Sequence, residues 1–336
     1  MGGLCGALVL HRFRSAASHS PSLAVLPLIS EEQPVTTLAI SGPLAARSSE
    51  VSGLDWYGDW LILLPQYPER LSGNVFALRK EDILAVVRGQ TSEPLVPQPI
   101  SFEDSQLGER IEGYEGYEAI AFQDNQVFLT IEAETDSSAR GYVVRGTIDP
   151  DLSELTVDPD KLAASPAQSQ SPNKADEALL LAEDKVISIY EVSGAQVNPM
   201  PQMHAFDFEL TPLPSVSFPT IEYRITDATQ LDEQNRFWAI NYFYEGDRDL
   251  LPIRDPLTIR HGRGPTHRQH KTVERLVEFS YAENRISFTN SAPIQLELAS
   301  AGRNWEGLVR LDDEGFLLVT DKFPETILGF VAEVEK

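Results

Sequence analysis

Residues 118–132 read EAIAFQDNQVFLTIE, and this stretch contains the pattern on which the fold prediction depends. An acid and a small residue open it, a short strand follows, and the polar turn QDN separates that strand from a strongly apolar one. The turn has hairpin chemistry, and a continuously apolar strand is typical of burial on both faces. The pattern recurs in four further segments, which read SGLDWYGDWLILLPQ from Ser52, EALLLAEDKVISIYE from Glu177, DATQLDEQNRFWAINYF from Asp227 and EGLVRLDDEGFLLVTD from Glu306.

The five segments begin 66, 59, 50 and 79 residues apart, and each interval has room for the hairpin and one or two weaker strands. Four-stranded antiparallel units at this period indicate an all-β fold, a β-propeller. A β-sandwich also has frequent turns, but it does not require the same acidic and small residues at the start of each unit. Helical periodicity is nearly absent, and residues 80–87 and 160–164 are predicted to form single turns at most.

Closure of the ring predicts a role for the N-terminal part of the chain. After Glu306 there are enough residues for three strands, so residues 35–40 (VTTLAI) are expected to supply the missing outer strand and cover a sheet edge. Five blades are visible, and a sixth fits in the 79-residue interval. We therefore predict a leader at residues 1–33 and one propeller domain at residues 34–336.

Composition restricts the partners. Acidic residues outnumber basic ones by 51 to 27, and a net charge of −24 disfavours binding to a nucleic-acid backbone. The single cysteine, Cys5, excludes an intrachain disulfide and a cysteine zinc cage. The apolar residues 2–10 are too few to span a bilayer; they are either the remnant of a signal or anchor segment, which favours export, or part of a disordered leader. We expect a monomer.

The repeated acids are the candidate site. If the first strand of each blade lines the central channel, the residues that open the repeats meet at one end of it. The ends of the second strands reach the same face, where Gln66 and Asn241 add neutral oxygens. Clustered carboxylates repel one another unless a cation neutralises them, and their oxygens suit Ca²⁺. The predicted metal ligands are Glu118, Glu132, Glu177, Asp227, Glu306 and Asp321. Alternatively, each acid stabilises a blade junction by accepting backbone N–H bonds.

A basic insertion at residues 245–275 is conspicuous in so acidic a chain. It follows a second strand and is expected on the same face as the acids. Its guanidinium groups could hold an anionic substrate, and the candidates are Arg254, Arg260, Arg263 and Arg268. Alternatively, the insertion is a solvated loop that docks on the acidic face. A transition-metal site at His261, His267 and His270 is disfavoured, because a Gly/Pro-rich loop rarely preorganises one.

The segments SGLDW…GDWLILLPQ, EAIAF…NQVFLTIEAE and WEGLVRLDDEGFLLVTDKF resemble the phytase-like propeller family, whose members are often described as having esterase-like activity. The chain is more distantly similar to gluconolactonase/regucalcin-like propellers. The first resemblance covers most of the chain and implies a Ca²⁺-dependent hydrolytic site for phosphoesters or carboxylic esters. Glu118, Glu132, Glu306 and Asp321 stand at the positions that match the family's pattern.

Two functions are consistent with the sequence. The first is a Ca²⁺-dependent hydrolase of a small anionic ester or phosphoester, with Glu118 and Glu306 as catalytic residues and the cation activating a bound water. No Gly-x-Ser-x-Gly motif occurs, which disfavours a covalent serine mechanism. The second is a non-catalytic propeller that binds a protein or small ligand on one face.

Overall fold

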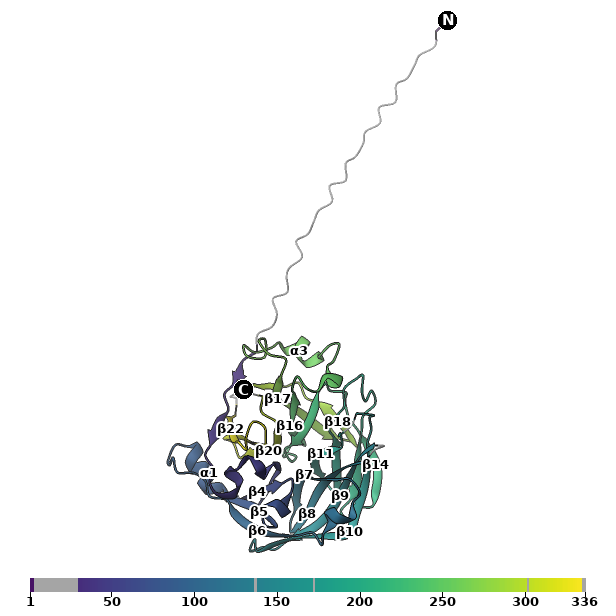
Figure 1. Cartoon of the computed structure of the whole chain (residues 1–336). Helices are drawn as coiled ribbons and strands as arrows, with labels where there is room; N and C mark the ends of the chain where they lie inside the picture. The colour runs from purple at the N-terminus through teal and green to yellow at the C-terminus, as the bar shows by residue number, and fades with distance from the viewer. Residues whose placement is uncertain (3–29, 136–137, 172, 301, 334–336) are drawn as a thin grey trace.

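The computed structural model describes residues 1–2, 30–135, 138–171, 173–300 and 302–333. Strands dominate this part of the chain and form five antiparallel blades that follow one another around a central axis (Figure 1). The all-β propeller prediction is confirmed.

The first two blades each contain four strands, and the edge of one pairs in parallel with the edge of the other through β6 and β10. Their strands are β3 (Val51–Tyr57), β4 (Trp60–Pro65), β5 (Asn74–Arg79) and β6 (Gln98–Glu103), then β7 (Tyr114–Gln123), β8 (Gln126–Thr135), β9 (Ser138–Ile148) and β10 (Glu154–Pro166).

The third blade also contains four strands, whereas in the fourth blade two short strands share the outer position beside the third strand. The strands are β11 (Asp176–Ala182), β12 (Lys185–Tyr190), β13 (Gln202–Asp207) and β14 (Pro212–Ser217), then β15 (Arg224–Ala228), β16 (Arg236–Phe243), β17 (Val273–Ala282), β18 (Arg285–Phe288) and β19 (Ile294–Leu296).

The fifth blade joins the two ends of the described chain. Its strands are β20 (Trp305–Leu311), β21 (Gly315–Thr320), β22 (Leu328–Ala332) and β2 (Thr36–Leu38). Thr36 pairs with Phe330 and Leu38 with Leu328, so the predicted closure by residues 35–40 is confirmed. An additional strand, β1 (Glu32–Gln33), pairs with β19, which places these two residues in the folded body rather than in the predicted leader. Residues 3–29 of that leader lie outside the described residues.

The inner strands form a closed ring, in which β3 packs on β7, β7 on β11, β11 on β15, β15 on β20, and β20 again on β3. The sixth blade that the 79-residue interval allowed is therefore wrong. The interval is long because it contains the remaining strands of the fourth blade together with the insertion.

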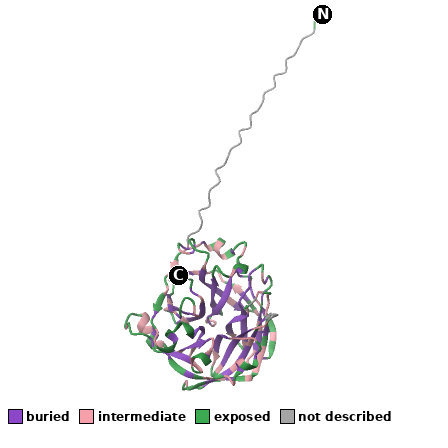
Figure 2. Cartoon of the chain, viewed as in Figure 1, coloured by how far each residue is buried: buried purple, intermediate pink, exposed green. Residues whose placement is uncertain are grey.

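The second strands are apolar on both sides because each lies between two neighbouring blades. In β4, Leu61 and Leu63 face the cluster shared with the fifth blade, whereas Ile62 and Leu64 face the cluster shared with the second. Successive side chains of a strand point to opposite faces, which explains this alternation. Each of the five blade junctions has such a buried cluster, and Figure 2 shows the buried strands inside an exposed periphery.

Two local predictions need correction. Residues 80–87 form two helical turns, α1 (Lys80–Val87), rather than one. Residues 160–164 lie within strand β10 and are not helical, because this segment pairs with β9. The other helices are α2 (Leu107–Arg110) and α3 (Pro256–His261), with 3₁₀ turns at Gly42–Ala45, Arg47–Ser49, Pro68–Leu71 and Arg248–Leu250. No helix in the described ranges is long and apolar enough to cross a membrane.

Candidate functional site

A β-bulge interrupts every inner strand at about the same level of the ring. The residues left out of the pairing are Ser52 in β3, Glu118 and Ala119 in β7, Glu177 in β11, Thr226 and Asp227 in β15, and Glu306 in β20. A bulge re-aims the side chain of its extra residue. In four of the five inner strands, the small residue after the opening residue marks the place where the strand turns that residue's side chain toward the axis.

In the fourth repeat, the equivalence predicted from the sequence is wrong by one residue. The hydroxyl of Thr226 donates to the carbonyl of Trp305, 2.5 Å away, just as the hydroxyl of Ser52 donates to the carbonyl of Tyr117, 2.6 Å away. In both cases the acceptor precedes the acid of the next blade, so Thr226, not Asp227, corresponds to Ser52. Asp227 instead accepts a bond from the backbone N–H of Leu308 at 2.6 Å and does not line the cavity on the axis. It has the blade-junction role that was the alternative.

These hydroxyl bonds predict a stability effect. Ser52→Ala and Thr226→Val should each lower the free energy of unfolding by about 1–2 kcal/mol, because each leaves a buried carbonyl without its donor. Urea denaturation measures this. Ser215→Ala, at an exposed position, is the matched control and should change stability little. If Ser215→Ala lowered the free energy of unfolding as much as Ser52→Ala and Thr226→Val do, the equivalence of Ser52 and Thr226 would be contradicted.

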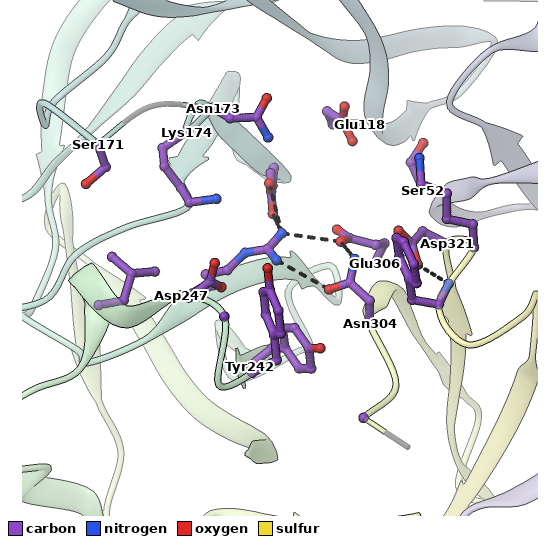
Figure 3. A pocket seen from close by; sticks show the side chains of 18 of the residues that line it. Ser52, Glu118, Ser171, Asn173, Lys174, Tyr242, Asp247, Asn304, Glu306 and Asp321 are labelled. Carbon is purple, nitrogen blue, oxygen red and sulfur yellow. Dashed lines mark hydrogen bonds and ion pairs between the residues drawn. The ribbon is translucent and has the colours of Figure 1, made fainter. Parts of the chain in front are cut away.

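The bulges of β3, β7, β11 and β20 open into one cavity of about 940 Å³, which we call the axial cavity (Figure 3). Five of the six predicted acidic ligands line it: Glu118, Glu132, Glu177, Glu306 and Asp321. The neutral residue Gln66 also lines it, whereas Asn241 does not and is buried beside the backbone of Glu222 and Arg224. The sequence prediction of a convergent acidic cluster therefore holds for the second, third and fifth blades, and the first blade contributes Ser52 and Gln66 to the same wall.

A buried arginine lies among these acids. The guanidinium group of Arg224 makes ion pairs with Glu191 and, at 3.3 Å each, with Glu177 and Glu306. Lys174 adds a second cation 3.4 Å from Glu191. Burial alone would raise the pKa of Glu191, but Arg224 and Lys174 hold that pKa below its ordinary value. Burial raises the pKa of Glu306 to about 8 in spite of Arg224.

Glu118 and Glu132 lie apart from the direct contacts of this arginine. Oε1 of Glu118 accepts a 2.8 Å bond from the amide of Gln66, and Oε1 of Glu132 is buried without a hydrogen-bond partner among the described residues. Burial raises the pKa of Glu118 well above its usual range, and the nearby Glu132 and Glu306 raise it further. Burial also raises the pKa of Glu132 to about 7. Glu118 therefore keeps its proton to higher pH than an ordinary glutamate does.

The basic insertion reaches the axial cavity through residues 245–250 and Thr272. The four arginines predicted to hold an anion do not line the cavity; Arg254, Arg260 and Arg268 are exposed and Arg263 is partly buried. His267 is buried and uses both ring nitrogens, with Nδ1 2.8 Å from Glu32 and Nε2 accepting from the N–H of Glu274.

Three residues of the cluster were missed. Arg224 opens β15 two residues before the bulge, and its spacing differs from that of the other repeats. Lys174 precedes β11 and belongs to no repeat pattern. Glu191 follows β12 as Gln66 follows β4 and Asp321 follows β21, so the rule that second strands end on this face contained the signal for it.

The expected calcium site does not fit the donor set. The charge that Ca²⁺ would supply among Glu177, Glu191 and Glu306 is already supplied by the guanidinium of Arg224. In the ranges that the structure describes, no three Asp, Glu, His or Cys side chains are arranged to hold a metal ion. Among the acids of the described axial cavity, Glu132 and Asp247 each have one buried oxygen without a hydrogen-bond partner, and no third acid with such an oxygen joins them. The carboxyl groups and their protons are therefore the chemistry that this cavity offers.

The fold and the site together define a five-bladed propeller with a buried carboxyl cluster on its axis. No protein-family model and no curated protein sequence matches the chain. Solved structures do resemble it. A glycosyl hydrolase from Bacteroides ovatus has 9% identity over 94% of this chain and 93% of its own, with a TM-score of 0.44. The Cellvibrio cellulosa α-L-arabinanase has 10% identity over 83% and 90%, with a TM-score of 0.44. A hypothetical protein from Leishmania major has 13% identity over 91% and 90%, with a TM-score of 0.42. At these identities the likeness concerns the fold alone.

Proposed function

We propose that the protein is a hydrolase that cleaves a neutral, hydroxyl-rich substrate, a glycoside, with the carboxyl groups of the axial cavity. The observation that carries this proposal is the contrast between Glu118 and Glu306. An amide is the partner of Glu118, whereas Glu306 accepts bonds from the guanidinium of Arg224 at 3.3 Å and from the amide of Asn304 at 2.5 Å. Glu118 therefore retains its proton to higher pH than Glu306. Two carboxyl groups in different protonation states are the requirement of glycoside hydrolysis.

The charge of the cavity supports a neutral substrate over the anionic one expected from the sequence. Acidic side chains outnumber basic ones along its wall. Arg224, which lies among them, is already engaged by Glu177, Glu191 and Glu306. A phosphate group would therefore meet a wall of carboxyl groups in which this guanidinium is not free to receive it, whereas sugar hydroxyls can exchange hydrogen bonds with carboxyl groups in either protonation state.

The proposed reaction assigns one role to each carboxyl group. Glu118 donates its proton to the glycosidic oxygen as the bond from that oxygen to the anomeric carbon breaks. Glu306, in its ionised form, takes a proton from the water that attacks the anomeric carbon. The products are a hemiacetal and an alcohol, and a proton returns from Glu306 to Glu118 through solvent. Arg224 and Asn304 orient Glu306 because both bind its Oε1.

Aryl glycosides, p-nitrophenyl phosphate and p-nitrophenyl acetate, each with and without EDTA, test the proposal. We expect glycoside turnover that survives EDTA. We also expect it to rise with pH through about 8, because Glu306 must lose its proton to act as base, and to fall at higher pH as Glu118 ionises. Phosphate or acetate turnover that EDTA abolishes would favour the calcium-dependent esterase that the phytase-like resemblance implies. Saturable glycan binding without turnover would favour the non-catalytic propeller.

A further inference from the structure

A second cavity, of about 780 Å³, lies at the opposite end of the hairpins, and we call it the turn-side cavity. The turns of the β15–β16 and β20–β21 hairpins line it, through residues 232–234 and 312–313. Arg224 and Glu306, which line the axial cavity, lie at the other ends of β15 and β20. The two cavities share no lining residue.

Aromatic side chains form the walls of the turn-side cavity. Trp238 and Phe316 meet edge to face with their ring centroids 5.6 Å apart, and the guanidinium of Arg310 lies 5.1 Å from the centre of the Phe316 ring. The indole N–H of Trp56 donates to the carbonyl of Arg310 at 2.7 Å, which fixes a third aromatic side chain in the wall. Such walls provide flat apolar surface for the body of a small ligand.

Acidic side chains outnumber basic ones around the turn-side cavity, and two of the basic ones are paired within the protein. Lys80 pairs with Asp312 at 2.8 Å, and Arg236 pairs with Asp232 at 3.0 Å. Glu278 is buried, and its Oε2 accepts bonds from the hydroxyls of Thr289 and Ser291. The surplus of acids in this wall disfavours an anionic ligand.

Three buried polar atoms of this wall have no hydrogen-bond partner among the described residues: Trp238 Nε1, Arg310 Nε and Glu278 Oε1, the last of which lies 3.8 Å from the guanidinium of Arg236. Trp238 and Glu278 are direct cross-strand partners on β16 and β17. Leaving such atoms unpaired costs free energy, so each calls for a partner. The set consists of two donors and one acceptor. A hydroxyl group offers the complement, two lone pairs and one O–H.

We propose that the turn-side cavity is a second ligand site, which binds a neutral hydroxylated molecule, a sugar residue, between the aromatic walls. Its hydroxyl groups accept from Trp238 and Arg310 and donate to Glu278. The proposal is independent of the proposed hydrolase function, because none of these residues lines the axial cavity.

The test is calorimetric titration with the methyl α- and β-glycosides of glucose, galactose and mannose, carried out in the full-length Glu118→Gln variant so that nothing is hydrolysed. At least one glycoside should bind and change the tryptophan fluorescence. Trp238→Phe, which keeps the ring packing but removes the N–H, should weaken that binding about fivefold to tenfold. Arg310→Met removes the other unpartnered donor, Nε of Arg310, and should weaken binding by a similar factor.

Trp60→Phe is the matched control, since Trp60 packs against Arg79 and does not line this cavity. The variant with this substitution should bind the glycoside as tightly as the Glu118→Gln protein from which it is made. The proposal is overturned if no glycoside in the panel binds, or if binding is unchanged in both Trp238→Phe and Arg310→Met while circular dichroism shows both variants folded. An inactive wild type that still shows Trp238-dependent binding would refute the hydrolase and leave this site intact.

Discussion

Glu118→Gln should lower kcat for glycoside hydrolysis by about 10²–10⁴-fold, the usual contribution of a general acid. Glutamine keeps the size of the side chain and a hydrogen-bonding group toward Gln66, but it cannot give a proton to the leaving oxygen. The loss should be smaller for substrates with a good leaving group, such as a dinitrophenol, because these need less protonation. Steady-state kinetics with aryl glycosides of graded leaving-group pKa measure this dependence.

Glu306→Gln should lower kcat by a similar factor, but equally for good and poor leaving groups, because Glu306 acts on the water. The limb of the pH profile near 8 should disappear in this variant. Glu154→Gln, at an exposed position, is the matched control and should keep full activity. If either cavity variant retained more than about a tenth of wild-type kcat, the corresponding role would be wrong.

Arg224→Met should have the largest effect on stability, a loss of about 3–5 kcal/mol near pH 8, because it leaves Glu177, Glu191 and Glu306 buried without their shared cation. The loss should depend on pH. Removing the guanidinium raises the pKa of Glu191 in the folded state above the value in the unfolded chain, and it raises those of Glu177 and Glu306, which burial already elevates, further still. The folded protein then binds more protons than the unfolded one, so its stability falls as the pH rises from about 4.3 upward.

Urea denaturation followed by tryptophan fluorescence at pH 5 and pH 8 measures this difference, and the variant should be much closer to wild type at pH 5. A second substitution, Glu191→Gln, should restore part of the stability of Arg224→Met at pH 8 by removing one of the stranded charges. Arg79→Met is the control, since Arg79 pairs with Glu81 at the surface and should matter little. A loss in Arg224→Met that did not change with pH would mean that the arginine acts through packing alone.

The architecture of the protein was predictable from its residues. The hairpin repeats predicted the blades, and the turns have the expected backbone: Gly58, Asp124, Glu183, Asn235 and Asp312 all have positive φ. Ring closure was predictable because one blade lacked a strand and an apolar segment near the start could supply it. These features are local, since the alternation of side chains and the chemistry of a turn are written in neighbouring residues.

The set of side chains that meet on the axis depends instead on the folded ring. A bulge shifts the register of a strand, so a fixed spacing from the hairpin turn led to Asp227, whose carboxylate accepts a backbone N–H bond at a blade junction. The cation of the cluster, Arg224, comes from the fourth blade, where Thr226 replaces the acid, and it contacts acids from the third and fifth blades. Such a match of charges depends on contacts 33 to 82 residues apart along the chain, and no local pattern encodes it.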